Sequence, residues 1–580
     1  MSKPSFLRPC IPLALISAAL PATALAQWAL DGAAVCTATG SQTEPAIATD
    51  GADGAIMGWT DHRSGVPRIY AQRVDAAGTP LWTADGVAVC TPVDGQHDVA
   101  MLKDFAGGAV LFWSDERSGG AQGLYAQRLA PTGLPVWPFS GVALSTHFGF
   151  PYDIVVTSDL STGHVVPRGF LVAWFEQGLG DDLAIRVQHV DAAAQGLWTA
   201  ASVGGALMCN TVNATKLDLV MDTDGAPGFS FLTGGAVLAW AESRPSSNDM
   251  DIFARRVDAG GTPQWTAGGI DVCAAAGVQR KPAIANVGGD DCIITWQDSR
   301  GSTSKIYAQR IDSTGQLFWA TDGVVVCPAG GPQTTPAILK DGAGGAFIAW
   351  VDARSGQSQV YAQRIGANGS LAWVLIGVPI GTAAAGADGL KLLSDGAGGF
   401  FATWRDTRSD SGDIFAQRVD ANGNVLWPLT GLPLSQAAGA QLTPAVVAGA
   451  GGLIAVWEDN RTGIGADVYA NRVTATGGVT AAPIVAVTSS LLSIVSGNPT
   501  RGEARFRLAL PESRNVSMDV CDVTGRRVRS LASGSAFAPG THALTWDGAN
   551  DLGALVPAGV YFVRLIAGNA AEALRVVVVR

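Results

Sequence analysis

Charged side chains are scarce in this chain of 580 residues, at 15% of the total compared with about 25% in an average soluble protein. Lys and Arg (38) are outnumbered by Asp and Glu (49), which leaves a net charge of −11. Because nucleic-acid affinity depends on clustered basic side chains, we expect no nucleic-acid partner. Hydrophobic residues make up 47% of the chain and argue against disorder, while 73 glycines indicate many turns. The composition therefore predicts a turn-rich β protein.

The sequence signatures of common metal and catalytic sites are also absent. The chain has no Cys-x-x-Cys, His-Glu-x-x-His or Gly-x-Ser-x-Gly segment, and its six histidines are scattered. These absences argue against a zinc site, a redox pair and a serine hydrolase turn. We therefore predict no metal, no cofactor and no identifiable catalytic residue, and we favour a non-enzymatic function without excluding an enzyme.

Long apolar stretches are lacking apart from residues 11–20. Two basic residues precede this stretch, and residues 24–26 read Ala-Leu-Ala, the small-x-small pattern that signal peptidase cuts. A membrane anchor is the alternative, but the stretch is shorter than the ~20 residues that span a bilayer. We predict a signal peptide at residues 1–26, no transmembrane segment, and a protein that is secreted or held at the outer-membrane surface.

The central part of the chain repeats one pattern eight times. Its leading Trp recurs every 53 to 66 residues, at positions 59, 113, 174, 240, 296, 350, 404 and 457. Turn signals divide each copy into four short strands. The second strand, for example residues 346–350, is apolar throughout and is expected to be buried on both faces. Four strands in about 55 residues are typical of a β-propeller blade.

A second Trp marks the last strand of each copy, and its positions predict how the ring closes. These residues stand at 82, 137, 198, 265, 319, 373 and 427, one fewer than the eight copies require. Residues 28–36, which begin with Trp28, match residues 82–90 and supply the missing strand. We therefore predict an eight-bladed β-propeller over residues 27–478, with the last blade closed by the N-terminal strand. An open solenoid is the alternative, but it leaves the split repeat unexplained.

The C-terminal region follows a different pattern. Residues 479–490 form a linker of small residues, and residues 491–580 alternate like the strands of a small β-sandwich. Characteristic segments are Asn-Pro, Val-Cys-Asp-Val-Thr-Gly-Arg, Pro-Gly-Thr-His, Trp-Asp-Gly and Ala-Gly-Val-Tyr-Phe, which begin at positions 498, 520, 539, 546 and 558.

This order of segments resembles the immunoglobulin-like domain of the flagellar hook-capping type. It is also similar to the C-terminal sorting domains of type IX secretion cargo. The resemblance implies an immunoglobulin-like fold, an extracellular fate and the secretion machinery as a partner. An accessory sandwich without a sorting role is the alternative.

The most repeated polar pattern is Trp-x-Asp-x-Arg, with Glu in place of Asp in one copy, at the end of the second strand. One interpretation is a ring of carboxylates that acts in acid–base catalysis or binds a metal ion. A feature repeated in seven copies fits better with one structural role, an ion pair that fixes the following turn. The third copy reads Trp-Phe-Glu-Gln from Trp174 and lacks the Arg. The members are Trp59, Asp61 and Arg63; Trp113, Asp115 and Arg117; Glu242 and Arg244; Trp296, Asp298 and Arg300; Trp350, Asp352 and Arg354; Trp404, Asp406 and Arg408; and Trp457, Asp459 and Arg461.

Four cysteines share one position in the repeat, eight residues after the second Trp: Cys36, Cys90, Cys273 and Cys327. Equivalent positions on different blades lie beyond the Cα separation of about 7 Å that a disulfide tolerates. We therefore interpret these cysteines as small, buried hydrophobic residues.

The candidate ligand-binding residues lie in the loops that lead to the first strand of each copy. Gln occurs there in five copies, as Gln42, Gln96, Gln279, Gln333 and Gln441. These loops are expected to ring one mouth of a central channel, where amides can bind a sugar or a peptide. Alternatively, the amides only satisfy backbone groups of the loops. Side chains that break the symmetry are predicted to add specificity: His97, Asp98 and Arg280.

We predict a secreted or surface binding protein whose propeller recognises an extracellular carbohydrate or protein as a monomer. A secreted hydrolase or lyase acting on polysaccharide is the alternative, because fold does not determine function. An enzyme is expected to show unrepeated acids at the channel mouth with perturbed pKa values. A third alternative, a purely structural surface protein, would self-associate.

Overall fold

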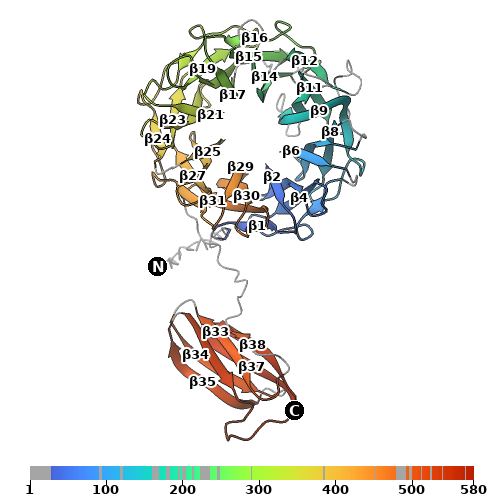
Figure 1. Cartoon of the computed structure of the whole chain (residues 1–580), viewed down its shortest axis with the longest axis vertical. Helices are drawn as coiled ribbons and strands as arrows, with labels where there is room; N and C mark the ends of the chain where they lie inside the picture. The colour runs from blue at the N-terminus through green and yellow to red at the C-terminus, as the bar shows by residue number, and fades with distance from the viewer. Residues whose placement is uncertain are drawn as a thin grey trace, which may run out of the picture. The chain divides into compact units, whose positions relative to one another are not determined.

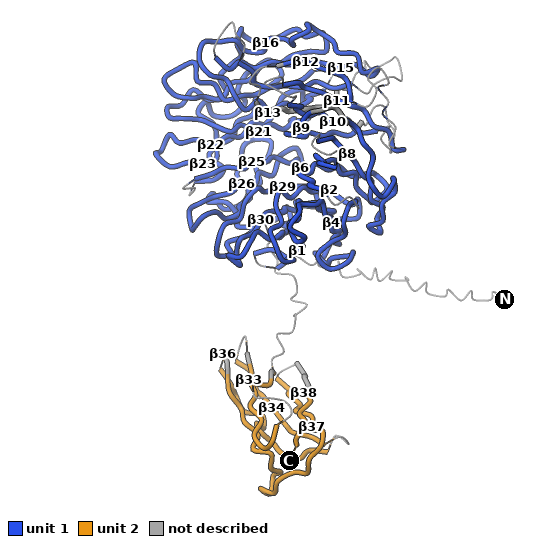
Figure 2. The backbone as a smooth tube through the Cα atoms, turned by 45° about the vertical axis from the view of Figure 1, so that its right-hand side comes forward, with its two compact units in different colours: residues 1–482 blue, residues 483–580 orange. Residues whose placement is uncertain are grey.

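The structure is a computed structural model and separates into two compact units, residues 1–482 and 483–580 (Figure 2). The predicted signal peptide and linker lie outside the described residues, and every secondary-structure element within them is a strand. The structure describes residues 28–579 except 30, 91–93, 118–121, 160–168, 178–182, 194–195, 197, 199–203, 212–214, 223–234, 244–248, 289–290, 383–385, 450, 478–491, 496–499, 511–512, 523–525, 539 and 568–569.

The first unit consists of antiparallel sheets arranged round a ring (Figure 1). Six of these sheets have four strands each. Their members are β2 (Gln42–Thr49), β3 (Ala55–Asp61), β4 (Arg68–Val74) and β5 (Val87–Ala88); β13 (Thr215–Asp222), β14 (Gly235–Ser243), β15 (Met250–Val257) and β16 (Ile270–Cys273); β17 (Gln279–Gly288), β18 (Asp291–Asp298), β19 (Lys305–Ile311) and β20 (Val324–Val325); β21 (Gln333–Lys340), β22 (Ala346–Asp352), β23 (Gln359–Ile365) and β24 (Val378–Gly381); β25 (Ala387–Ser394), β26 (Phe400–Asp406), β27 (Asp413–Val419) and β28 (Leu432–Ser435); and β29 (Gln441–Gly449), β30 (Gly452–Asp459), β31 (Asp467–Thr474) and β1 (Ala33–Cys36).

One seven-stranded sheet joins two copies of the repeat. Its long strand β9 (Val142–Asp159) pairs with β8 through its first residues and with β10 through its later ones. The sheet therefore contains two four-strand units that share β9. Its other members are β6 (Gln96–Lys103), β7 (Ala109–Asp115), β8 (Gln122–Leu129), β10 (Gly169–Gln177), β11 (Leu183–Asp191) and β12 (Ala206–Thr211).

The apolar second strands are buried on both faces, as their sequence predicts. Every residue of β3, β7 and β22 is buried. In one core cluster, Ile348 and Trp350 of β22 pack with Ile293 and Ile306 of the preceding sheet. This packing of sheet against sheet confirms an all-β chain built of four-stranded units, and the inner strands such as β21 and β25 line the centre of the ring (Figure 1).

Adjacent sheets are joined by hydrogen bonds to one backbone carbonyl. The Trp373 indole N–H donates to the carbonyl oxygen of Ala421 in the next sheet at 3.2 Å. The Arg364 guanidinium donates to the same carbonyl at 3.3 Å and also bonds Asp341 at 2.8 Å. The same joint recurs along the chain: Trp82 with Pro131, Trp137 with Ala192, Trp198 with Ala259, Trp265 with Ser313, Trp319 with Ala367, and Trp427 with Ala475.

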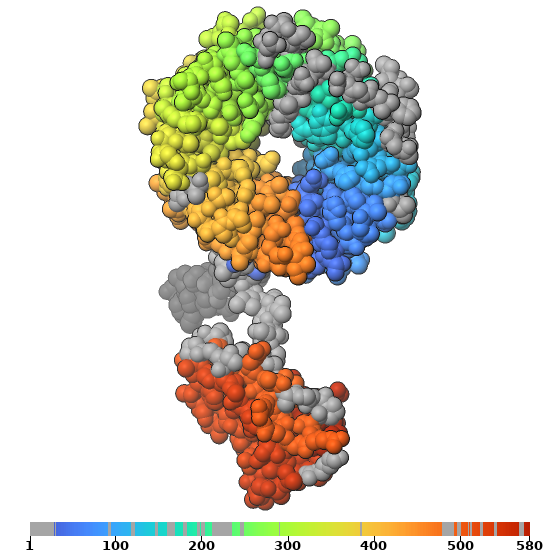
Figure 3. All heavy atoms as spheres, viewed as in Figure 1, coloured from blue at the N-terminus to red at the C-terminus, as the bar shows by residue number. Residues whose placement is uncertain are grey.

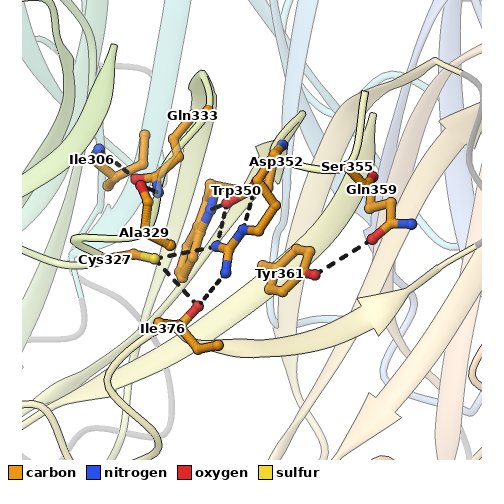
Figure 4. Close-up of polar contacts among 12 residues, drawn as sticks. Ile306, Cys327, Ala329, Gln333, Trp350, Asp352, Ser355, Gln359, Tyr361 and Ile376 are labelled. Atoms are coloured by element: carbon orange, nitrogen blue, oxygen red, sulfur yellow. Dashed lines mark hydrogen bonds and ion pairs between the residues drawn. The ribbon is translucent and has the colours of Figure 1, made fainter. Parts of the chain in front are cut away.

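The Trp-x-Asp-x-Arg pattern builds a buried network at the end of the second strand, as the copy with Trp350 shows (Figure 4), whereas Arg244 of another copy lies outside the described residues. The fully buried Asp352 carboxylate accepts hydrogen bonds from the Trp350 indole (2.9 Å) and from Nε of Arg354 (2.8 Å). Arg354 also lies 4.0 Å from the centre of the Tyr361 ring and donates to the carbonyl of Ile376 at 2.8 Å. One Arg therefore holds the second strand, the third strand and the turn before the fourth strand together.

The leading Trp is also covered by a turn of its own sheet. Gly377 has a φ of 73°, in the left-handed region that favours glycine, and a Cβ there would lie 2.7 Å from the Trp350 ring. Only glycine fits this turn without displacing the indole.

The degenerate third copy restores the missing cation from another strand. Arg186 of β11 lies directly opposite Trp174, the position where other copies carry an aromatic residue such as Tyr361. It forms an ion pair with Glu176 and donates to the carbonyl of Gly204 at 3.3 Å. The sequence pattern misses this replacement because the Arg lies on a different strand.

The repeated cysteines are buried between sheets and are not in disulfides. The Cys327 thiol donates to the carbonyl of Ile376 and accepts a hydrogen bond from Arg354 of the next sheet, both at 3.2 Å (Figure 4). Burial raises the pKa of Cys36 and Cys273 to about 12 and that of Cys90 to about 11, so these residues remain thiols. They therefore belong to the polar network and are more than the purely hydrophobic residues that the sequence predicts.

The second unit is a sandwich of two antiparallel sheets. Buried side chains from both sheets, among them Phe506, Met518 and Val563, pack round the fully buried Trp546. This packing matches the expected small β-sandwich. The sheets are β32 (Leu492–Ile494), β33 (Ala504–Leu510) and β36 (Gly540–Trp546); and β35 (Arg527–Phe537), β34 (Arg514–Cys521), β37 (Gly559–Ala567) and β38 (Ala570–Val578).

Two buried carboxylates face each other between β26 and β27. Asp413 lies directly opposite Asp406, and their exposed fractions are 1% and 0%. Burial raises the pKa of Asp413, and the carboxylates of Asp410 and Asp406 raise it further, while a hydrogen bond with Ser409 and the charge of Arg408 act in the opposite direction. Like charges directly opposite each other destabilise a sheet when both are ionised. Because the folded-state pKa is raised, the stability that Asp413 contributes at low pH is lost as the pH rises through that pKa.

The ion-pair network predicts that Asp352→Asn lowers the free energy of unfolding by about 3 kcal/mol, because it leaves the partly buried Arg354 without its carboxylate. Thermal melts of the full chain followed by circular dichroism measure this loss. Asp94→Asn, which changes an exposed Asp outside the network, is the matched control. Equal melting temperatures for both variants would contradict a stabilising role of the ion pair.

The opposed carboxylates predict that Asp413→Asn raises the melting temperature at pH 8 by about 1–2 °C, because Asn does not ionise and donates to Asp406. At pH 4, where Asp413 is more protonated, the gain is expected to shrink. Melting curves at both pH values, with Asp94→Asn as control, measure the difference. A lower melting temperature for Asp413→Asn at pH 8 would show that the ionised carboxylate is stabilising.

Candidate functional site

The five repeated glutamines lie at the first residue of the inner strands β2, β6, β17, β21 and β29, and their side chains are fully buried. Gln333 accepts a hydrogen bond from the backbone N–H of Ile306 in the preceding sheet at 3.2 Å (Figure 4), and Gln96 accepts one from Ile69 at 3.0 Å. The Gln42 amide donates to two carbonyls of its own loop at 3.2 Å. The structure therefore places these amides inside the loops and sheet junctions, and not on the surface of the channel mouth, where we expected them.

The side chains that reach the mouth stand two positions later, at a β-bulge. The strand register shifts one residue after the Gln, and the residue at the bulge has a left-handed backbone although it is not glycine. Such φ values are uncommon for residues with side chains and cluster at functional sites. The residues and their φ values are Glu44 (55°), Asp98 (56°), Lys281 (55°), Thr335 (49°) and Thr443 (49°), and Asp153 of β9 shares this backbone (50°).

These bulge residues differ between copies, whereas the surrounding repeat is nearly constant. Sequence analysis found Asp98 as an irregular residue but missed Glu44, Thr335 and Thr443 as members of the set. Their shared signal is a register two residues after the Gln, where Thr occurs in two copies and Glu, Asp and Lys in one copy each.

One side of the mouth is acidic. The innermost strands β2, β6 and β9 are neighbours on the ring (Figure 1) and carry Glu44, Asp98 and Asp153. Glu44 accepts hydrogen bonds from the Thr60 hydroxyl at 3.1 Å and from the Asp98 backbone at 3.4 Å. Burial raises the pKa of Asp98, the negative charges of Glu44 and Asp153 raise it further, and His97 acts in the opposite direction. The Asp98 carboxyl is therefore poised to hold a proton at higher pH than an ordinary Asp.

The side chain of His97, one of the predicted candidates, lies close to another acidic side chain. Its Nε2 atom lies 3.4 Å from Oε1 of Glu116, and both side chains are partly exposed. His97 and Glu116 therefore extend the polar surface beside Asp98.

The facing side of the mouth is basic and hollowed. A cavity of about 460 Å³ lies against β17, β21 and β25, on the other side of the ring from β2 and β6 (Figure 1), and Figure 3 shows the central opening. Lys281 and Lys391 line it, and the predicted candidate Arg280 is exposed next to Lys281. Burial lowers the pKa of Lys281, and so does the neighbouring Arg280, while Asp388 acts in the opposite direction. The remaining lining residues are Pro282, Ala283, Ile284, Thr335, Pro336, Ala337, Ile338, Gly389, Leu390 and Leu392.

The mouth therefore combines a carboxyl with a raised pKa on one side and a cation-lined cavity on the other. The cavity has the chemistry to hold an anionic group, and the Asp98 carboxyl the chemistry to donate a proton. Among the described residues, no cluster of three or more His, Cys, Asp or Glu is arranged to hold a metal ion. Nor does that part of the chain contain a helix long and apolar enough to cross a membrane.

Comparison with solved structures finds similar chains at low identity. The α-L-arabinofuranosidase Arb93A of Fusarium graminearum has a TM-score of 0.33 and 11% identity, over 56% of this chain and 93% of that chain. An endo-arabinase of Bacteroides thetaiotaomicron has a TM-score of 0.27 and 11% identity, over 41% and 89%. An acylaminoacyl peptidase of Pyrococcus horikoshii has a TM-score of 0.37 and 8% identity, over 72% and 57%.

No curated protein matches the chain in sequence. Residues 495–571 do match a family, described as the FlgD Ig-like domain. The match covers the sandwich of the second unit and confirms the resemblance that its Trp-Asp-Gly and Ala-Gly-Val-Tyr segments indicated. The chain therefore carries a FlgD Ig-like domain at its C-terminal end.

Proposed function

We propose that the chain is an extracellular binding protein whose first unit is a closed, eight-bladed propeller. The channel mouth binds an extracellular carbohydrate or protein without a cofactor, and the protein acts as a monomer. A signal peptide at residues 1–26 directs export, and the FlgD Ig-like domain, joined through the linker at residues 479–490, engages the secretion machinery.

Strand pairing between the two ends of the repeat region supports the closed ring. Strand β1 pairs with β31, so that Ala33 lies opposite Ala470. Trp28 and Arg472 both donate to the carbonyl oxygen of Ala76, at 3.3 and 2.8 Å. This is the joint that Trp373 and Arg364 make with the next sheet elsewhere in the repeat.

The closed ring predicts that Trp28→Ala destabilises the chain by about 3–5 kcal/mol, because it removes a buried indole from a sheet junction. Trp427→Ala, which removes the equivalent indole from an internal sheet, is the matched comparison. Thermal melts of both variants are expected to show similar losses. A neutral Trp28→Ala beside a damaging Trp427→Ala would mean that the N-terminal strand does not close the ring.

The asymmetry of the channel mouth carries the proposed binding function. A repeat that serves only as a frame needs the same side chain in every copy, yet the bulge position carries acids on one side and Lys281 on the other. Specific recognition of a ligand requires different side chains around a concave site. Charge on the cavity wall favours a ligand with anionic groups.

The raised pKa of Asp98 supports a second candidate, a polysaccharide hydrolase or lyase. Glycoside hydrolysis uses a protonated carboxyl as general acid and a second carboxylate as partner. Asp98 and the neighbouring Glu44 are the residues that would take these roles. Since an acid must be protonated to donate, such activity would fall as the pH rises through the raised pKa of Asp98.

A screen of the full chain on glycan and extracellular-matrix protein arrays separates the two functions when sugar release is measured on the same polysaccharides. For a binding protein we expect saturable binding without turnover, weakened about tenfold by Lys281→Glu. Lys340→Glu, at an exposed Lys outside the cavity, is expected to bind like the unmodified chain.

Turnover that Asp98→Asn abolishes and that falls with rising pH would establish the enzyme instead. A chain with neither saturable binding nor turnover would overturn both candidates.

A further inference from the structure

Three inner strands present their edges to the cavity at the channel mouth. Four consecutive residues of each strand line it: 281–284 of β17, 335–338 of β21 and 389–392 of β25. Successive side chains of a strand point to opposite faces, so a run of four lining residues means that the backbone edge itself faces the cavity. Each of these strands is the first member of its sheet and pairs on one side only. The cavity wall therefore offers unpaired backbone donors and acceptors.

Only one of the three edges keeps a backbone donor at the position directly after the bulge residue. The third residue after the strand start is Pro282 in β17 and Pro336 in β21, and the same position is Pro444 in β29. In β25 this residue is Leu390. Proline is tolerated in edge strands where the N–H side faces away from the sheet, so the Leu390 N–H is expected to point toward the channel.

The pairing register of the strands supports the equivalence of Leu390 and Pro282. In β17 the pairing with β18 skips the two residues between Arg280 and Ala283, and in β25 the pairing with β26 skips the two between Asp388 and Lys391. Leu390 therefore occupies the position of Pro282 and does not lie opposite a residue of β26.

The charges round this edge select an anionic partner. Lys281 and Lys391 are the only charged side chains among the described residues that line the cavity, in a chain whose net charge is −11. The nearby Asp388 is bonded to Arg405 at 2.8 Å. The cavity is therefore a local positive field on an acidic protein, which attracts acidic groups and repels a second copy of the chain.

We propose that an extended peptide with acidic side chains adds to the free edge of β25, with its acidic groups toward Lys281 and Lys391. A row of backbone groups is matched by another backbone, and the partly buried Ile338 and Leu392 offer apolar contacts beside it. None of the described lining residues is aromatic, so the cavity wall gives a sugar ring no stacking platform. This inference rests on the proposed binding function and narrows its ligand from a carbohydrate or protein to an acidic peptide strand.

Leu390→Pro tests the edge directly, since it removes one N–H and introduces the residue that equivalent positions already carry. The probe is a short fluorescein-labelled peptide of alternating Glu and Val, and its binding to the full chain is followed by anisotropy. We expect binding that weakens with salt and is about tenfold weaker in Leu390→Pro than in Leu390→Ala, which loses the packing of the same buried side chain but keeps the N–H. Lys391→Gln is expected to weaken it as well, and Lys340→Gln to leave it unchanged.

Two comparison probes, an acidic glycan and a basic peptide, can contradict the proposal. An oligogalacturonate that binds the unmodified chain and Leu390→Pro equally, while the Glu-Val peptide does not bind, would assign the cavity to an anionic glycan. Peptide binding that is indifferent to Leu390→Pro, or equal binding of a Lys-Val peptide, would also overturn it. The proposed binding function survives these outcomes and fails only if the arrays yield no saturable ligand.

Discussion

A buried carboxylate, held between an indole and a guanidinium, is the interaction on which the repeated sheets depend. In the copy that contains Asp352, it ties the end of the second strand to the aromatic residue of the third and, through Arg354, to the turn before the fourth. Buried charge is costly unless it is paired and fully hydrogen-bonded, so losing any member exposes the rest to that cost. In the third copy only the ion pair is rebuilt: Arg186 supplies the cation from another strand, whereas the buried Trp174 indole N–H has no hydrogen-bond partner among the described residues.

These networks are repeated from sheet to sheet, but one position of the repeat carries a different side chain in different copies. The Gln side chains and the leading Trp residues are buried wherever they occur, whereas the bulge two residues after the Gln carries Glu44, Asp98, Lys281 or Thr335. Backbone strain at this bulge is borne by the rigid sheets around it. The function that we propose therefore lies at the channel mouth, where unlike side chains surround one opening and the inner edge of β25 is unpaired.

Joints between neighbouring sheets link the two ends of the repeat region. Ala76 receives Trp28 from the beginning of the region and Arg472 from its end, the arrangement found at Ala421 within it. The closed ring that we propose has no terminal sheet to protect, which removes the edge that an open array must cap. The free edges that remain are those of the innermost strands, and proline at the bulge blocks several of them.

The sequence by itself determined the repeat, its four-strand units, the pairing role of the N-terminal strand and the C-terminal sandwich, because these follow from period, turn signals and the positions of Trp. It also indicated the ion pair within each copy, since period-two spacing puts Asp352 and Arg354 on one face. Only the tertiary structure decided that the five glutamines are buried, that Arg186 replaces a missing Arg, and that Glu44, Asp98 and Lys281 share one bulge. These facts depend on register shifts and on contacts between sheets, and neither leaves a local pattern in the chain.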